Sequence, residues 1–146
     1  MGGPGKTARE RTGPPVLAAF TTWATEKTRN MDTDQFGHVN HAAMATLLEG
    51  ARIDLVFTPE LASEASGIDL LVASLTMVFH RELAAPGMVR IGSVVRRIGT
   101  SSLDIHQGIF DDGECVASAE AVCVLLDRAS RRPARVGDRM RAHLMP

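Results

Sequence analysis

Residues 30–52 read NMDTDQFGHVNHAAMATLLEGAR and join a run of turn-forming residues to a long apolar segment. Residues 30–38 are rich in Asp, Asn and Gly, which favour loops. From Val39 to Phe57 the apolar residues follow the spacing of a helix without an internal proline, and Pro59 ends the segment. Because this helix is apolar on nearly every side, we expect the rest of the protein to enclose it.

Five strand-like segments accompany the predicted helix. One precedes it, and four follow it with short links of turn-forming residues such as AAPG and DDG. They lie at residues 17–29, 70–83, 88–99, 102–110 and 114–127. Strands joined by such short links pair antiparallel. The pattern predicts an α+β fold, with one curved antiparallel sheet wrapped around one long central helix and a short helix at 137–145.

The chain of 146 residues is the size of one domain, with 45% hydrophobic and 23% charged residues. Residues 1–16 are rich in Gly, Pro, Arg and Thr and predict a flexible N-terminal tail, which leaves 17–146 as a single domain. The first residues lack the apolar core of a secretory signal, and no run of about 18 apolar residues is available to span a membrane. We therefore expect a cytoplasmic protein without a membrane partner.

Charge and cysteine content narrow the functional classes. The formal net charge is −1 and aromatic residues make up 4% of the chain, which argues against nucleic acid as a partner. Cys115 and Cys123 lie in one predicted strand, on the same face and about 26 Å apart, too far for a disulfide. We expect both to be small buried packing residues.

The start of the predicted helix either carries chemistry or is a well-capped helix end. N–H groups in a first turn lack partners within the helix and carry partial positive charge, so they bind anions or the oxyanion of a thioester under attack. Asp34 could attack such a carbonyl or activate a water, and Gly37 would let a ligand approach the backbone. Asp34 or Asn40 could equally be a cap, with His38 and His41 as surface residues. A metal site is disfavoured, because the two histidines lack a third ligand at a recognisable spacing.

The segment DTDQFGHVNHAAMATLLEGAR, residues 32–52, resembles the signature of the hotdog-fold acyl-CoA thioesterases of the 4-hydroxybenzoyl-CoA thioesterase type. That family shows D-x-D-x-x-G, often followed by H-V-N, and then a helix that ends near E-x-A-R. The resemblance extends over residues 20–135 and includes the turn APG, the segment GTSSLDIHQGIFDDGECVASAEAVCVLLDR and the closing RRPARV. It implies the hotdog fold, hydrolysis of an acyl-CoA thioester to the free acid and CoA, a homodimer or homotetramer, and no metal or cofactor.

Carried over position by position, the resemblance makes Asp34 the catalytic carboxylate, acting as nucleophile through a mixed anhydride or as general base for water. The backbone N–H of His41 would polarise the thioester carbonyl from the first turn of the helix. His38 and Asn40 match a catalytic histidine and an asparagine of the related plant acyl-carrier-protein thioesterases. Gly37 would shape the loop that meets the substrate.

The other polar and aromatic residues of the segment are expected to have supporting roles. Phe36 stands where the plant enzymes have an asparagine, so a catalytic role of His38 competes with an orienting one. We place Phe36 with the loop glycine and the asparagine among the substrate-binding candidates. Asp32 is expected to hold the loop through side-chain hydrogen bonds. Glu49 is expected to be structural, and Arg52, three residues further along the helix, could pair with it.

Two other functions stay open. Hotdog hydratases and dehydratases act on enoyl-CoA and usually show D-x-N-P-x-H, whereas here Asp34 and His38 are separated by three residues without a proline. A hotdog module that binds or senses acyl-CoA without turnover would have little use for Asp34. Absorbance at the enoyl band distinguishes the first from a thioesterase, and binding without thiol release marks the second.

Overall fold

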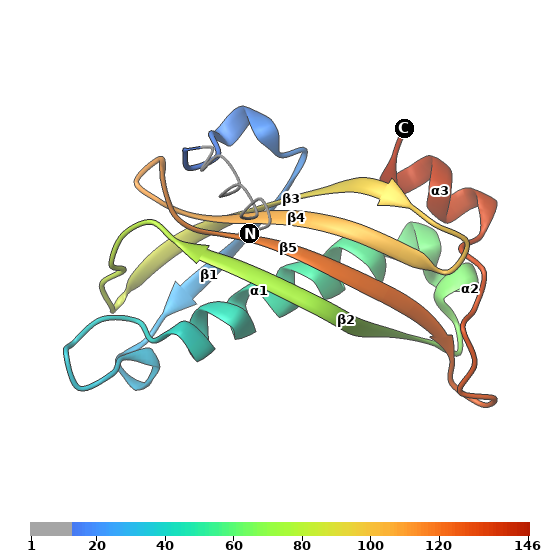
Figure 1. Cartoon of the computed structure of the whole chain (residues 1–146), viewed down its shortest axis with the longest axis horizontal. Helices are drawn as coiled ribbons and strands as arrows, with labels where there is room; N and C mark the ends of the chain where they lie inside the picture. Colours follow the sequence, from blue (N-terminus) through green and yellow to red (C-terminus); the bar gives the residue numbers. More distant parts are fainter. Residues whose placement is uncertain (1–12) are drawn as a thin grey trace, which may run out of the picture.

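The computed structural model describes residues 13–146 and contains a five-stranded antiparallel sheet with helices, so the α+β prediction is confirmed (Figure 1). The helices are α1 (His41–Val56), α2 (Ala62–Ala65) and α3 (Asp138–Leu144), and 3-10 helices occupy Leu17–Ala19, Asn30–Asp32 and Pro59–Leu61. The strands are β1 (Thr22–Thr28), β2 (Ile68–Phe79), β3 (Gly87–Ile98), β4 (Ser102–Asp111) and β5 (Glu114–Asp127). Of the predicted tail 1–16, residues 1–12 lie outside the described residues.

The strands lie in the order β1-β3-β4-β5-β2, so β3, β4 and β5 form a meander and β1 and β2 form the two edges. The DDG sequence makes the turn between β4 and β5. Asp112 and Gly113 have φ values of 49° and 81°, the left-handed backbone that a two-residue hairpin turn of matching twist requires. The predicted hairpin is therefore confirmed in position and in turn chemistry.

Helix α1 runs along one face of the sheet (Figure 1). Its buried residues recur at helical spacing and pack towards the strands; they are Met44, Leu48, Ala51, Arg52, Leu55 and Val56. The opposite side of the helix, with Ala42, Thr46 and Ile53, is exposed in the single chain. The expectation of an enclosed helix is therefore wrong for the isolated chain, because the sheet covers α1 from one side only.

A buried polar network joins α1 to the sheet. Gln107 on β4 donates from Nε2 to the Leu48 carbonyl and to Ser93 Oγ, both at 3.0 Å. Its Oε1 accepts from Arg52 Nη1 at 2.8 Å, and this orientation of the amide follows from its partners, because a guanidinium only donates and a carbonyl only accepts. Burial lowers the pKa of Arg52. In the described part of the chain Arg52 and Glu49 do not form the ion pair that their spacing allows, because the guanidinium turns into the core and donates to Gln107.

A smaller apolar cluster lies on the other face of the sheet, away from α1. Its rings are those of Phe20, Trp23 and Phe110, which meet edge to face with centroids 5.5 to 6.1 Å apart. The predicted strand 17–29 begins only at Thr22, because a 3-10 turn precedes the aromatic side chain at position 20 and brings it onto the sheet. This cluster gives the sheet a second, independent apolar contact.

The two cysteines are free and buried, as predicted, but they face opposite sides of the sheet. Cys115 packs in the outer aromatic cluster, whereas Cys123 lies in the core beneath α1. The prediction of a shared face is wrong because the pairing of β4 with β5 shifts between Ile109 and Phe110, and one extra residue of β5 reverses the alternation. Burial raises the pKa of the Cys115 thiol to about 11, which keeps the thiol neutral at physiological pH.

Replacement of Gly92 by alanine is expected to destabilise the fold by about 1 to 3 kcal/mol. A Cβ at Gly92 would lie 2.6 Å from Cγ and 2.7 Å from Cβ of Phe20, so the ring would have to leave the outer cluster. Gly87→Ala in the same strand is the matched control, since its Cβ would meet only Thr28 Oγ1 at an ordinary 3.5 Å. Urea unfolding of both variants measures the difference, and equal midpoints would contradict a tight contact at Gly92.

Candidate active site

The segment before α1 folds into a tight turn. Thr33 and Val39 form a β-bridge across it, and within it the Asp34 N–H donates to the His38 carbonyl at 2.9 Å. The Gly37 N–H donates to the Asp34 carbonyl at 3.1 Å, and Gly37 has a φ of 82°. A residue with a side chain is strained in that conformation, so the backbone geometry accounts for the glycine.

The Asp34 carboxylate is oriented by the turn that it begins. Its Oδ1 accepts from the Phe36 N–H at 2.8 Å and lies 3.5 Å from the backbone nitrogen of His38. Within residues 13–146 no donor contacts Oδ2, and the side chain is exposed. Asp34 therefore caps the turn rather than the helix, and one of its two oxygens is available to a ligand or a water.

The helix cap is Asn40, one of the two candidates that the sequence left open. Its Oδ1 accepts from the Ala43 N–H at 2.7 Å, and its own N–H donates to the Asp32 carbonyl at 2.9 Å. The N–H groups of His41 and Ala42 have no acceptor in the described part of the chain. Two donors of the first turn are therefore free at the positive end of the helix dipole.

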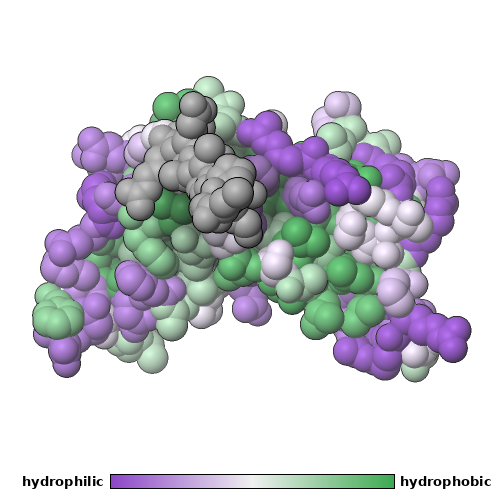
Figure 2. Space-filling model, viewed as in Figure 1, coloured by the Kyte–Doolittle hydropathy of each residue, from purple (hydrophilic) through white to green (hydrophobic). Residues whose placement is uncertain are grey.

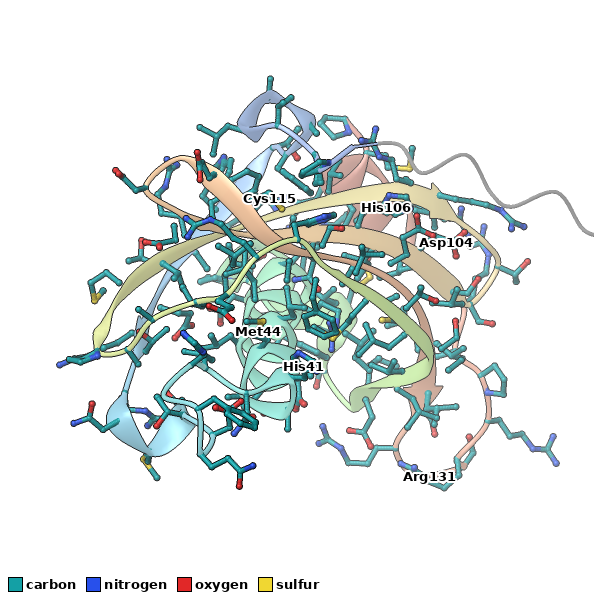
Figure 3. The ribbon with its side chains drawn as sticks, turned by 60° about the vertical axis from the view of Figure 1, so that its left-hand side comes forward. His41, Met44, Asp104, His106, Cys115 and Arg131 are labelled. Atoms are coloured by element: carbon teal, nitrogen blue, oxygen red, sulfur yellow. The ribbon has the colours of Figure 1, made fainter. Side chains whose placement is uncertain are left out.

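The ring of His41 is engaged with a neighbouring strand. It stacks on Phe79 at the end of β2, with ring centroids 3.8 Å apart and planes inclined by 15°. Figure 3 shows His41 at the start of α1, with Met44 one turn further along. The stack ties the first helical turn to β2, so the imidazole of His41 is engaged, whereas its backbone N–H has no acceptor among residues 13–146. No local pattern connects Phe79 with His41, because the two residues lie 38 positions apart in the chain.

The ring of His38 contacts the loop between β2 and β3, which is distant from it in the sequence. Its Nε2 lies 3.1 Å from Oε2 of Glu82, in the loop between β2 and β3. The backbones of the two segments are also joined, because His38 forms a β-bridge with Ala84 and the Val39 N–H donates to the Leu83 carbonyl at 2.8 Å. Only the antiparallel docking of these segments could have revealed Glu82, since no local pattern points to it.

Asp32 has the loop-holding contacts that were expected of it. Its carboxylate accepts from the backbone N–H of Arg29 at 2.8 Å and from the Arg29 guanidinium at 3.3 Å. The side-chain hydrogen bond from Arg29, followed by the backbone hydrogen bond, holds the pKa of Asp32 below its usual value. A lowered carboxyl pKa stabilises the fold above the unfolded-state pKa, and the contribution is lost as the pH falls through the folded-state value.

The structure places the six predicted site residues on one continuous segment. Asp34, Phe36, Gly37 and His38 belong to the turn, and Asn40 and His41 belong to the start of α1. The side chain of Phe36 is 74% exposed.

Among residues 13–146 no group of three or more His, Cys, Asp or Glu side chains is placed to hold a metal ion. In that same range no helix is long and apolar enough to cross a membrane. The predictions of no cofactor and of a cytoplasmic location remain predictions.

The fold and this turn-to-helix segment are those of a known superfamily. The family model of the thioesterase-like superfamily matches residues 28–144, so the chain belongs to that superfamily and the resemblance read from the sequence is confirmed. No sequence among curated proteins matches the chain.

Solved structures extend the comparison. The PA5185 protein from Pseudomonas aeruginosa strain PAO1 has a TM-score of 0.78 at 24% identity, covering 90% of this chain and 94% of its own. A thioesterase from Thermus thermophilus, in complex with coenzyme A and zinc, has a TM-score of 0.74 at 26% identity, with 88% and 94% covered. The DHNA-CoA thioesterase from Staphylococcus aureus has a TM-score of 0.69 at 21% identity, with 78% and 79% covered. The same overall fold therefore recurs across distant sequences.

Asn40→Ala is expected to lower the free energy of unfolding by about 1 kcal/mol, because the Ala43 N–H loses its side-chain acceptor at the helix start. Asn40→Asp is the matched control and is expected to stay near the stability of the unmodified chain, since its carboxylate can accept the same hydrogen bond. Urea unfolding at neutral pH provides the comparison. Equal losses in both variants would mean that the cap hydrogen bond is not what Asn40 contributes.

Proposed function

We propose that this chain hydrolyses an acyl-CoA thioester to the free acid and CoA, with Asp34 and the N-terminus of α1 as the reacting groups. The observation that carries the proposal is one juxtaposition. A carboxylate with one oxygen that has no donor among residues 13–146 lies on the turn that leads directly into a helix start, where two N–H groups have no acceptor in the same range. Membership of the thioesterase-like superfamily supports it, and coenzyme A in the similar Thermus thermophilus structure supports the carrier.

The two elements divide the chemistry between them. The His41 N–H, aided by the helix dipole, would stabilise the growing negative charge on the thioester oxygen. Asp34 would either attack the carbonyl carbon to form a mixed anhydride that water then opens, or take a proton from the water that attacks. In both routes the C–S bond breaks and CoA leaves as its thiolate, which then takes up a proton. These steps use protein groups and water.

Supporting residues fit around these two groups. Gly37 gives the turn its left-handed corner, and Asn40 holds the helix start in place. Phe36 offers an exposed apolar surface at the turn for part of the substrate. Because the His41 ring stacks on a strand, its catalytic contribution is assigned to the backbone, and His38 is assigned an orienting role beside Asp34.

We also propose that two copies pair through β2 to complete a hotdog dimer, with a tetramer as the larger alternative. The edges of the sheet differ in character: β1 carries Glu26 and Lys27, whereas β2 has no charged residue after Asp69. Figure 2 shows apolar side chains gathered along β2 on the face in view. They are between 37% and 51% exposed and comprise Leu71, Val72, Leu75, Val78 and Phe79. A long apolar edge of this kind needs a covering strand, and a second copy supplies one.

Asp34→Asn is expected to lower kcat for thiol release by about a hundredfold or more. The variant removes the charge but keeps a side-chain oxygen that can accept from the Phe36 N–H, so the turn should survive. A thiol-reactive dye measures release from short, long and aromatic acyl-CoAs. Gln35→Ala, an exposed neighbour in the same turn, is the control and should keep its activity.

The outcomes of this experiment separate the candidate functions. Full activity in Asp34→Asn would contradict the assigned role of the carboxylate. Acyl-CoA that binds to the unmodified chain without any thiol release would replace the enzyme by a binding module, a reading favoured by the use of Asp34 Oδ1 as a turn cap. A change at the enoyl band without thiol release would indicate a hydratase.

Val78→Lys is expected to convert the dimer to a monomer, because a charge on the pairing edge of β2 opposes strand pairing. Val122→Lys is the matched control: Val122 is 36% exposed but lies on β5, inside the sheet. Sedimentation equilibrium gives the mass of each variant. A dimer that tolerates lysine at position 78 would place the contact elsewhere.

A further inference from the structure

The loop between β2 and β3 brings a carboxylate to the turn that carries Asp34. Glu82 Oε2 lies 3.1 Å from His38 Nε2, and the two side chains are 76% and 38% exposed. His38 in turn is bound to Asp34 through the backbone, because its carbonyl accepts from the Asp34 N–H at 2.9 Å. Glu82 is therefore linked through His38 to the backbone of the turn that carries the proposed catalytic carboxylate.

We infer that Glu82 is a positioning residue that fixes the proton and the orientation of the His38 imidazole at this site. The inference rests on the proposed function. A carboxylate only accepts hydrogen bonds, so a neutral imidazole beside it must carry its hydrogen on Nε2. The lone pair of Nδ1 is then free to accept a hydrogen bond from the attacking water. This arrangement gives His38 an orienting role without a direct contact to the substrate.

The backbone holds the two segments together without help from the contact between the Glu82 carboxylate and the His38 ring. The His38–Ala84 bridge and the hydrogen bond from the Val39 N–H to the Leu83 carbonyl join them, and Val39 and Leu83 are both buried. Loss of the Glu82 charge should therefore free the ring of His38 while leaving the turn folded. A variant of Glu82 can therefore test whether the residue positions the His38 ring without also unfolding the turn.

The expected effect is modest because the pair is exposed. A contact of a charged group that stays exposed to water changes an equilibrium or a rate by about three- to fivefold at most. We expect a change of that size in the ratio of the two neutral tautomers of His38. We expect a fall of similar size in kcat, with KM within about twofold, since substrate binding does not involve Glu82.

Glu82→Gln tests the inference. The glutamine amide has both a donor and an acceptor, so it can pair with either tautomer and selects neither. Glu114→Gln is the matched control, because Glu114 is 74% exposed and pairs at 3.3 Å with Arg81, away from His38. Nitrogen-15 NMR of the imidazole at about pH 9, well above the ordinary imidazole pKa, gives the tautomer ratio. Thiol release from acyl-CoA gives kcat and KM for the same proteins.

A fall in both the tautomer ratio and kcat in Glu82→Gln, with neither changed in Glu114→Gln, supports the inference. An unchanged tautomer ratio overturns the inference, because Glu82 then does not select the tautomer of His38. A changed ratio with unchanged kcat overturns the positioning role while the proposed hydrolysis stands. If the unmodified protein releases no thiol from acyl-CoA, the proposed function itself fails, and the role of Glu82 in hydrolysis fails with it.

Discussion

The position of α1 on the sheet depends on the buried amide of Gln107. All three hydrogen bonds of this side chain are internal, to Arg52 and Leu48 on the helix and to Ser93 on β3. Water cannot replace these partners in the core, so sliding or rotating the helix would leave several polar groups without a partner. The helix is therefore held in one place, and with it the free N–H groups at its first turn.

Capping and chemistry, which the sequence presents as alternatives, are compatible in this segment. Asn40 caps the helix, while Asp34 uses one oxygen to close the turn and keeps the other uncommitted. The N–H groups that the cap does not satisfy are the ones that a ligand would meet. A helix start can thus be stable and still present N–H donors to a ligand, because the cap side chain accepts from only one of the N–H groups in the first turn.

The two faces of the sheet are covered by different elements, and its two edges differ in charge. The aromatic cluster of Phe20, Trp23 and Phe110 covers part of one face, and α1 covers the other. The β1 edge is protected by charge, whereas the apolar β2 edge is open and lies next to the stack of Phe79 on His41. Pairing of copies at β2 would therefore take place beside the proposed reaction site, and under the proposed function assembly would be coupled to the chemistry.

The local sequence pattern was enough to predict much of the secondary structure of this protein. The predicted strand 114–127 and the predicted helix agree closely with β5 and α1, because alternation, helical spacing and turn residues act over a few neighbours. The six candidate site residues could be proposed from sequence because all of them fall within residues 34–41. Tertiary structure alone decided the rest. Arg52 faces Gln107 instead of Glu49, one extra residue in β5 turns Cys115 away from Cys123, and Glu82 and Phe79 reach the site from elsewhere. Each of these depends on which segments pack together, which no window of neighbouring residues contains.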